Sequence, residues 1–376
     1  MRVVILGAGF GGLELSTRLS EELGDGVQVT LIDKSDVFVF GYAKLDVMFG
    51  RRTFDEVRLP YSAISRPNVE FRQETVTSID ATAKRVTTDK GSYEADVLVI
   101  ALGADYDVAA TPGFAEAGHE FYSPEGAAAL RETLESFQRG DLVVSVLGPF
   151  FKCPAAPYET VFLLHDLLVA RGIRDACTIT LVTTMPKPIP ISDEVSGALL
   201  ALCDERTIHH SHATRIESLD PVEKVARAND GRTFPFDLFL GIPVHKAPDV
   251  VVESGLTDDG WIAVDKATLA TKFPGVYAVG DITSAPVPRA GGIAEGEAKT
   301  VAEVLIAQAK GGPAPAPYDG RGVCYVEMGG QAIGRVDVDF LTGPAPTALY
   351  GAPTLETAEE KREFGAIRRR RWFGLD

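Results

Sequence analysis

The sequence predicts an α/β fold made of two successive units of parallel strands and helices, followed by a smaller C-terminal region. The first unit opens with MRVVILGAGFGGLELSTRLSEEL, which reads as a buried strand, a glycine turn and a helix. The second unit begins at residue 141, where the strand DLVVSVLG precedes the helix PYETVFLLHDLLVARGI. Uninterrupted apolar runs of this kind are typical of parallel strands that are buried on both faces.

The remaining elements follow in order along the chain. In the first unit VQVTLID is the next strand, and short strands lead to the buried run DVLVIALGA. In the second unit CTITLVTTM is a strand, and a helix follows near residues 192–205. From Phe236 the pattern changes to strand-like DLFLGIP, WIAVDK and GVYAVGDI, and a helix is expected over 292–309. After the proline- and glycine-rich linker GGPAPAPYDG come two strand-like stretches, GVCYVEM and AIGRVDVDFL.

Composition and charge exclude several classes of protein. The chain has 376 residues, 45% hydrophobic and 24% charged, which suits a globular protein of two or three domains. No apolar run approaches the ~20 residues that span a bilayer, and no secretory signal precedes the first strand, so a cytoplasmic location is expected. A net charge of -16 argues against nucleic acid as a partner.

The glycine turn predicts a dinucleotide-binding, Rossmann-like domain. Gly7, Gly9 and Gly12 form G-x-G-x-x-G between a strand and a helix. The first glycine permits the tight turn, the second admits the pyrophosphate, and the third lets the helix pack closely on the strand. The phosphates then lie at the positive N-terminus of the helix. Asp33 ends the next strand, 21 residues past Gly12, where it can bind a ribose diol.

The dinucleotide is expected to be FAD. VYAVGDI, with Gly280 and Asp281, resembles the second FAD motif of the two-dinucleotide flavoproteins, and IALGA resembles their crossover into the second domain. Because neither Tyr42 nor Ala104 has a cysteine nearby, we expect FAD to be bound non-covalently. The expected FAD contacts are Gly7, Gly9, Phe10, Gly11, Gly12, Asp33, Lys34, Val76, Ala101, Gly103, Gly280, Asp281 and Ala294.

The second unit departs from the usual plan of that superfamily. Where an NAD(P)H-binding glycine loop would stand, the sequence reads LGPFFKCPAAPYE, without a second G-x-G-x-x-G. Its prolines have no N–H to donate to a pyrophosphate, and the following strand ends in threonines rather than an acid. We therefore expect an FAD domain (1–108 and 237–312), an inserted domain that has lost its dinucleotide (109–236), and a C-terminal region (313–376).

Two cysteine segments carry a more specific resemblance. FKCPAAPYE around Cys153 and GRGVCYVEMGG around Cys324 resemble the redox-cysteine segments of sulfide:quinone oxidoreductases and of the flavocytochrome c sulfide dehydrogenase flavoprotein. The resemblance covers essentially the whole chain. It implies that the two cysteines form a redox-active pair beside the flavin, which accepts sulfur and electrons from sulfide. Hydrosulfide would attack their disulfide and leave a persulfide on one cysteine and a thiolate on the other.

Other candidate residues have competing interpretations. Glu159 belongs to the matched motif and could take a proton from hydrosulfide or a thiol, or it could be an ordinary capping glutamate. Lys152 could favour a thiolate at Cys153, or it could be solvated. Cys177 and Cys203 are expected to be buried as small hydrophobic residues. The spacing of the four cysteines matches no zinc site, and for the cluster HHSH (209–212) a polar strand end is preferred to a metal site.

The electron acceptor and the C-terminal tail complete the hypothesis. The resemblance implies a quinone acceptor, for which the tail supplies Phe340, Tyr350, Phe364, Trp372 and Phe373. The terminal EEKREFGAIRRRRWFG suits an anionic membrane surface, although its apolar residues do not share one helical face. Packing of this tail on its own domain or on a second subunit is the alternative. The leading hypothesis is a peripheral sulfide:quinone oxidoreductase; a type II NADH:quinone oxidoreductase and a flavoprotein subunit serving a cytochrome are the alternatives.

Overall fold

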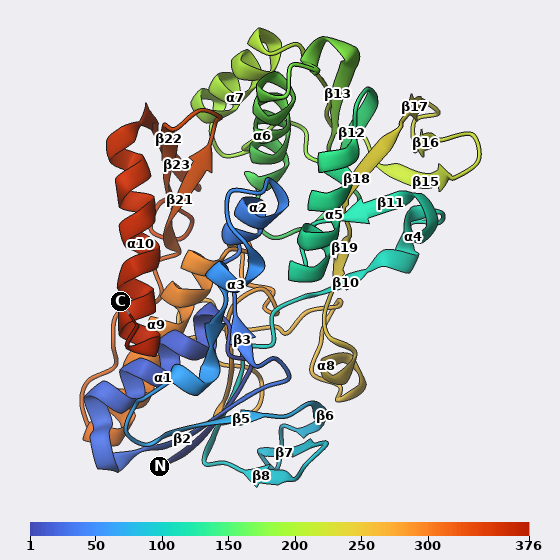
Figure 1. Ribbon diagram of the computed structural model, residues 1–376. Coiled ribbons are helices and arrows are strands. Elements are labelled where there is room, and N and C mark those ends of the chain that lie inside the picture. Colours follow the sequence, from blue (N-terminus) through green and yellow to red (C-terminus); the bar gives the residue numbers. More distant parts are fainter. Residues whose placement is uncertain (376) are drawn as a thin grey trace.

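The computed structural model describes residues 1–375, and its first domain is built on a parallel sheet. Five strands run in the order β20-β9-β1-β2-β5. Figure 1 shows helices α1 and α9 on one face of this sheet, and the small sheet β6-β7-β8 with α8 on the other. The elements are β1 (Arg2–Leu6), α1 (Phe10–Leu23), β2 (Gln28–Asp33), β5 (Val69–Gln73), β6 (Val76–Asp80), β7 (Arg85–Thr88), β8 (Ser92–Glu94), β9 (Val97–Ile100), α8 (Asp249–Glu253), β20 (Val276–Ala278) and α9 (Gly291–Lys310).

The inserted domain is a second five-stranded parallel sheet. Its order is β11-β18-β12-β13-β14, and the three-stranded sheet β15-β16-β17 extends from it. The elements are α4 (Phe114–Ala117), β11 (Gly118–Glu120), α5 (Pro124–Ser136), β12 (Gly140–Val146), α6 (Ala156–Ala170), β13 (Cys177–Val182), α7 (Asp193–Glu205), β14 (Ile208–Ser211), β15 (Ile216–Asp220), β16 (Val225–Ala228), β17 (Thr233–Pro235) and β18 (Leu238–Ile242). Both units predicted from the strand–helix alternation are therefore present.

The boundary expected at residue 236 falls one strand too early. β18 lies between β11 and β12 and pairs with both, so residues 238–242 belong to the second sheet. The chain crosses between the domains through an antiparallel pair, β10 (Asp105–Asp107) and β19 (Val244–Lys246). The sequence predicts DLFLGIP in the first domain, but an apolar run does not reveal which of two sheets it joins. WIAVDK forms two isolated bridges, Asp258–Trp261 and Ile262–Thr283, instead of a strand.

The C-terminal region is an antiparallel sheet and a long helix. The sheet runs β21-β22-β23, and β21 packs against α6 of the inserted domain within one continuous core. Its elements are β21 (Arg321–Glu327), β22 (Ile333–Asp339), β23 (Thr347–Thr354) and α10 (Leu355–Phe373). Close to the first domain lie β3 (Val37–Phe38), α2 (Ala43–Met48), α3 (Phe54–Val57) and β4 (Leu59–Pro60).

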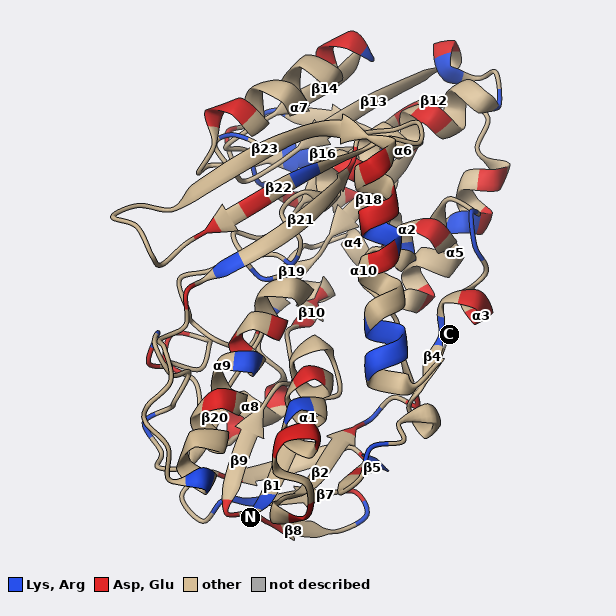
Figure 2. Cartoon of the chain, turned by 90° about the vertical axis from the view of Figure 1, so that its left-hand side faces the viewer, with Lys and Arg blue, Asp and Glu red and all other residues tan. Residues whose placement is uncertain are grey.

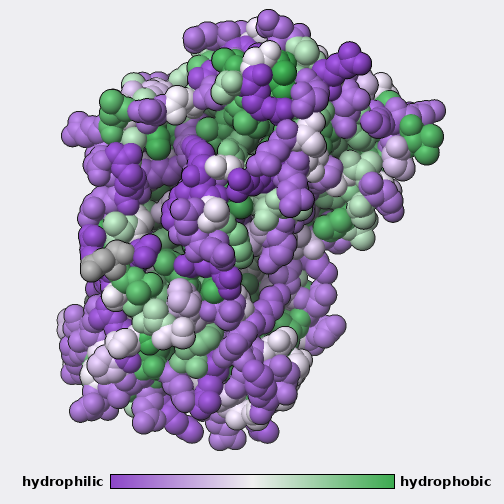
Figure 3. All heavy atoms as spheres, viewed as in Figure 1, coloured by the Kyte–Doolittle hydropathy of each residue, from purple (hydrophilic) through white to green (hydrophobic). Residues whose placement is uncertain are grey.

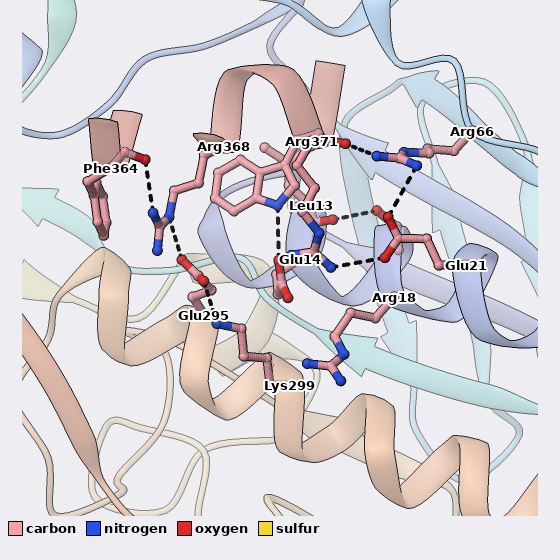
Figure 4. Close-up of polar contacts among 12 residues, drawn as sticks. Leu13, Glu14, Arg18, Glu21, Arg66, Glu295, Lys299, Phe364, Arg368 and Arg371 are labelled. Atoms are coloured by element: carbon pink, nitrogen blue, oxygen red, sulfur yellow. Dashed lines mark hydrogen bonds and ion pairs between the residues drawn. The ribbon is translucent and has the colours of Figure 1, made fainter. Parts of the chain in front are cut away.

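The end of α10 packs on the first domain, in agreement with the second of the two interpretations of the tail. Trp372 and Phe373 are 1% and 2% exposed and lie in the same core as Phe38. The indole Nε1 of Trp372 donates to the Glu14 carboxylate at 3.0 Å, and Arg371 forms an ion pair with the same carboxylate (Figure 4). These two aromatic side chains are thus part of that core.

The basic residues of α10 are also matched by acids of the first domain. Arg368 pairs with Glu295 of α9 at 2.6 Å, and Arg371 pairs with Glu21 of α1 at 3.1 Å (Figure 4). Figure 2 shows the basic end of α10 close to α1. On the face drawn in Figure 3, hydrophilic side chains predominate and hydrophobic ones are scattered between them. No helix within residues 1–375 is long and apolar enough to cross a bilayer.

Candidate functional site

A cavity of about 350 Å³ lies where the strands of both parallel sheets end. The turns after β1, β9, β12 and β20 contribute to it, together with β21 and α10. The carboxyl edge of a parallel sheet is the usual binding region of this kind of fold. Of the residues expected from the sequence, those that line the cavity are Gly9, Phe10, Gly11, Ala101, Gly103, Cys153, Glu159, Gly280, Asp281, Ala294 and Cys324.

The glycine turn after β1 leaves no room for side chains. Gly7 has φ +98°, and a Cβ on Gly12 would lie 1.9 Å from the Gly7 carbonyl oxygen. A Cβ on Gly9, by contrast, would meet no atom within 4 Å, so the turn is open on that side. The α1 N-terminus has no side-chain cap and no acid in its first turn. The backbone can therefore receive a phosphate there.

Asp33 stabilises the same turn from the end of β2. Its carboxylate accepts hydrogen bonds from the backbone N–H groups of Ala8 and Ser35, both at 2.8 Å. Burial raises the pKa of Asp33, and the Ala8 bond partly offsets this effect. The Tyr61 hydroxyl donates to the Ala8 carbonyl at 2.8 Å. The turn is thus rigid before any ligand binds.

A second helix N-terminus faces the same cavity. The helix α9 has no side-chain cap at Ala290, and Gly291 and Gly292 of its first turn line the cavity. Gly280 has φ +82°, and its N–H donates to the buried Glu297 carboxylate. Asp281 follows it at the cavity wall, where burial raises its carboxyl pKa. Two uncapped helix N-termini and a buried acid fit the phosphates and hydroxyls of FAD, and the adjoining apolar wall fits its ring system.

Cys153 lies on a strained loop at the cavity wall. It has φ +54°, a left-handed conformation that only a few per cent of non-glycine residues adopt. The loop is held by two backbone hydrogen bonds: Cys153 N–H donates to the Arg289 carbonyl at 2.8 Å, and Ala156 N–H donates to the Cys153 carbonyl at 2.9 Å. The side chain is exposed to the cavity although it lies deep in the molecule. Strain of this kind is often found at functional positions.

Cys324 lines the same cavity from β21 and completes the pair expected from the sequence. Burial, with the neighbouring Glu159 carboxylate as the second cause, raises the pKa of the Cys324 thiol to about 11. Burial also raises the pKa of Cys153 well above its usual value, again with Glu159 as the second cause. Both thiols are therefore protonated at neutral pH, and a base is needed to ionise them.

Glu159 is the acid whose charge acts on both thiols. It is 3% exposed and lines the cavity, and burial raises its carboxyl pKa to about 7. Its Oε1 accepts a hydrogen bond from the backbone N–H of Glu327 at 2.9 Å. Glu159 belongs to α6, which follows Cys153, and Glu327 belongs to β21, which carries Cys324. This hydrogen bond therefore links the segments that bear the two cysteines.

An ion cluster lies behind Glu159. The Glu327 carboxylate accepts from Lys361 at 2.5 Å and from Arg51, which also pairs with Asp46 at 2.8 Å. Lys361 is 7% exposed and comes from α10. One glutamate thus connects β21, α10 and the segment after α2. A single buried charge would be costly, and the pairing offsets that cost.

The far end of the cavity is aromatic. Tyr325 of β21 and Phe364 of α10 line it, with ring centroids 5.8 Å apart in an edge-to-face arrangement. Arg368 lies over the Phe364 ring at 3.3 Å. Tyr325 directly follows Cys324 on β21, so the two side chains leave opposite faces of the strand, and both line the cavity. An apolar planar ligand such as a quinone ring fits such a wall.

The sequence analysis missed Lys44, Arg51 and Lys361. Lys44 interrupts the largely apolar segment 37–49, and this interruption is a signal that could have been used. Arg51 and Lys361 occur among other charged residues, so their burial has no sequence signature. Lys152 is half-buried, and its ammonium donates to the Ala104 carbonyl at 2.7 Å.

Several expected residues lie away from the cavity lining. Lys34 is exposed beyond β2, and Val76 is half-buried at the start of β6. Cys177 and Cys203 are buried in the core of the inserted domain, as expected. Of the HHSH cluster, His212 hydrogen-bonds to the Tyr158 hydroxyl at 2.7 Å.

Comparison with known proteins agrees with the fold. A family model described as pyridine nucleotide-disulphide oxidoreductase matches residues 1–147 and 167–311. The mitochondrial sulfide:quinone oxidoreductase of Mus musculus is 23% identical over 92% of this chain and 79% of its own. A type II NADH:quinone oxidoreductase of Staphylococcus haemolyticus is 26% identical over 82% and 83%. The sulfide:quinone oxidoreductase structure from Aquifex aeolicus superposes with a TM-score of 0.87 at 23% identity, covering 98% and 92%.

Proposed function

Since the chain belongs to the pyridine nucleotide-disulphide oxidoreductase family, and is therefore an FAD-binding oxidoreductase, we propose that it oxidises sulfide to sulfane sulfur and reduces a quinone. The observation that supports this most is the placement of Cys153 and Cys324 in one cavity with Glu159, beside the turns that fit FAD. In the net reaction hydrosulfide, a quinone and one proton give sulfane sulfur and a hydroquinone. Sulfide loses two electrons, and the quinone gains two electrons and two protons.

The donor half of the reaction uses the two cysteines. In the oxidised enzyme they form a disulfide, and hydrosulfide attacks one sulfur while the S–S bond breaks. One cysteine becomes a persulfide and the other leaves as a thiolate. Glu159, with its raised pKa, takes the proton that the attacking sulfur or a thiol must lose. The turns at Gly9–Gly11 and Gly280 would hold FAD, which would supply a two-electron acceptor between the cysteines and the quinone.

The acceptor half uses the aromatic end of the cavity. Tyr325 and Phe364 would hold the quinone ring, and Lys361, which lines the same cavity, would offer an N–H donor to a quinone oxygen. The sulfide:quinone and the NADH:quinone oxidoreductases among the relatives differ in their donor, but both are named for a quinone. This favours a quinone as the acceptor.

A type II NADH:quinone oxidoreductase is the second candidate, favoured by a 26% identical relative of that name. In this chain the position of the nucleotide loop is occupied by residues 148–157, with Pro149, Pro154 and Pro157 and the strained Cys153. Prolines supply no N–H groups for phosphates. This loop supports sulfide rather than NADH as the donor.

The deciding experiment is anaerobic stopped-flow mixing of the holoenzyme with sulfide and, separately, with NADH. We expect sulfide to bleach the visible flavin absorbance within one turnover and NADH to leave it nearly unchanged. A quinone added afterwards should restore the absorbance. Rapid bleaching by NADH alone would select the second candidate.

The pH dependence of this reduction tests Glu159. Its carboxylate is ionised above a pKa of about 7, so reduction by sulfide should accelerate as the pH rises through that value. Glu159→Gln should be about 100-fold slower at about pH 8, the usual contribution of a general base. At about pH 5.5, where wild-type Glu159 is protonated, the two proteins should react at similar rates. Parallel pH–rate profiles would show that Glu159 is not the base, because the ionisation of sulfide itself is common to both.

A further inference from the structure

Two lysines line the cavity on the Cys153 side. Lys44 belongs to α2, and Lys152 directly precedes the cysteine. The Lys44 ammonium donates to the Tyr122 carbonyl, and the Lys152 ammonium donates to the Ala104 carbonyl at 2.7 Å and lies 3.3 Å from the Tyr106 hydroxyl. Within residues 1–375, no carboxylate oxygen comes within 4.0 Å of either ammonium group. Both lysines are half-buried, and each ammonium is held by carbonyl or hydroxyl oxygens instead of by an acid.

A rigid aromatic group holds both lysines in place. The Tyr106 hydroxyl donates to the Tyr122 carbonyl at 3.1 Å, and the Tyr122 hydroxyl donates to the Lys152 carbonyl at 2.9 Å. The Lys152 N–H donates to the His245 ring nitrogen Nε2 at 3.3 Å. The other nitrogen of His245 lies 2.8 Å from the Pro243 carbonyl, and burial lowers the pKa of this histidine to about 3. His245 is therefore neutral, and it positions the backbone next to Cys153.

The charges around this wall are mixed, and Lys152 interacts with the charges of Asp281, Asp105 and Arg289. Lys44 interacts with the charges of Lys152, Glu120, Cys153 and Asp281, and burial lowers its pKa to about 8. Asp281 is the acid at the cavity wall among these groups. An ammonium has three donors, and within residues 1–375 the Lys44 ammonium has the Tyr122 carbonyl as its partner. Donors therefore remain available for a ligand in the cavity.

We propose that Lys44 and Lys152 form an anion-binding subsite that receives hydrosulfide next to Cys153. The identity of the anion rests on the proposed function; the subsite itself rests on the two lysines without carboxylate partners. Hydrosulfide is a small anion, and fixed positive charge in a partly desolvated cavity raises its local concentration. The lysines act before the chemical step, by holding the attacking sulfur close to the cysteine.

The subsite is tested first without sulfide. Reduced holoenzyme is alkylated with iodoacetate, an anion, and in parallel with neutral iodoacetamide, and modification of the Cys153 peptide is followed by mass spectrometry. The ratio of the two rate constants measures the local attraction for an anion and cancels changes in thiol pKa. Lys44→Met and Lys152→Met should each lower this ratio about fivefold. Lys44→Arg should retain it.

Lys310→Met is the matched control, because Lys310 is exposed at the end of α9 and its loss changes the net charge equally. It should leave the ratio unchanged. The FAD content of each variant, measured from the visible absorbance, shows that the cavity is intact. An unchanged ratio in both Lys44→Met and Lys152→Met, with normal FAD content, would overturn the subsite.

Sulfide is the second arm of the test. In stopped flow, Lys44→Met should raise the half-saturating sulfide concentration about fivefold and change the limiting rate less. A lower limiting rate at an unchanged half-saturating concentration would overturn the proposal and assign Lys44 to the flavin. If sulfide fails to reduce even the wild-type flavin while the alkylation ratio still depends on Lys44, the proposed function fails and the subsite stands for another anion.

Discussion

Replacing Cys153 with serine should lower the rate constant for flavin reduction by sulfide at least ~10³-fold, and replacing Cys324 should do the same. A serine hydroxyl can neither form the disulfide that hydrosulfide attacks nor leave as a stable anion at neutral pH. The measurement is anaerobic stopped flow at saturating sulfide, followed by the visible absorbance of the flavin. Because the two cysteines act as a unit, the double variant should be no slower than either single variant.

Cys177→Ser is the matched control for this prediction. Cys177 is buried at the start of β13, in the core of the inserted domain and outside the cavity lining. It should reduce at nearly the wild-type rate, and all variants should retain FAD. If Cys153→Ser and Cys324→Ser both reduced at the wild-type rate, the cysteines would not carry the electrons and the proposed reaction would be wrong.

Trp372→Ala should destabilise the protein by about 4 kcal/mol, the usual cost of removing a large buried aromatic side chain. Trp372 is 1% exposed and packs edge-to-face against Phe10 and Phe38, with ring centroids 5.5 and 5.9 Å away. Its loss also removes a hydrogen bond from Glu14, whose side chain is fully buried. Urea unfolding of the holoenzyme, followed by far-UV circular dichroism, measures the change.

Two companion variants of α10 make this prediction specific. Trp372→Phe keeps most of the buried volume and should cost less than half as much. Ile367→Ala changes an exposed position of the same helix, where the side chain is 46% exposed, and should cost under about 1 kcal/mol. An equally small effect of Trp372→Ala would show that the end of α10 does not stay packed on the first domain in solution.

Much of the fold could be predicted from the sequence because its signals are local. The turn at Gly7–Gly12 and the motif at Gly280–Asp281 each require particular backbone conformations, and such requirements are visible in the residues themselves. The position of β18 was not visible, because Leu238–Ile242 is equally apolar whichever sheet it joins. Helix α10 carries charge on most faces, so its packing depends on acids of α1 and α9 that lie far away in the sequence.

The candidate site shows the same limit. Cys153, Cys324 and Glu159 could be proposed because their segments resemble known ones. Lys44 and Lys361 could not, because a lysine in a sequence is usually solvated, and only the tertiary structure shows that these two face a cavity. The role of Glu327 could not be predicted either. Its backbone N–H donates to Glu159, and its carboxylate pairs with Arg51 and Lys361, which come from other elements.

The contact between Glu14 and Trp372 also has a consequence for the order of folding. The two residues are 358 positions apart, so the loop that their hydrogen bond closes is nearly as long as the described chain. During synthesis the tryptophan that covers α1 leaves the ribosome hundreds of residues after α1 itself. Until then the buried face of α1 stays open to water and to other nascent chains. Slow translation or premature termination should therefore leave an aggregation-prone intermediate, whose first domain is formed but not closed.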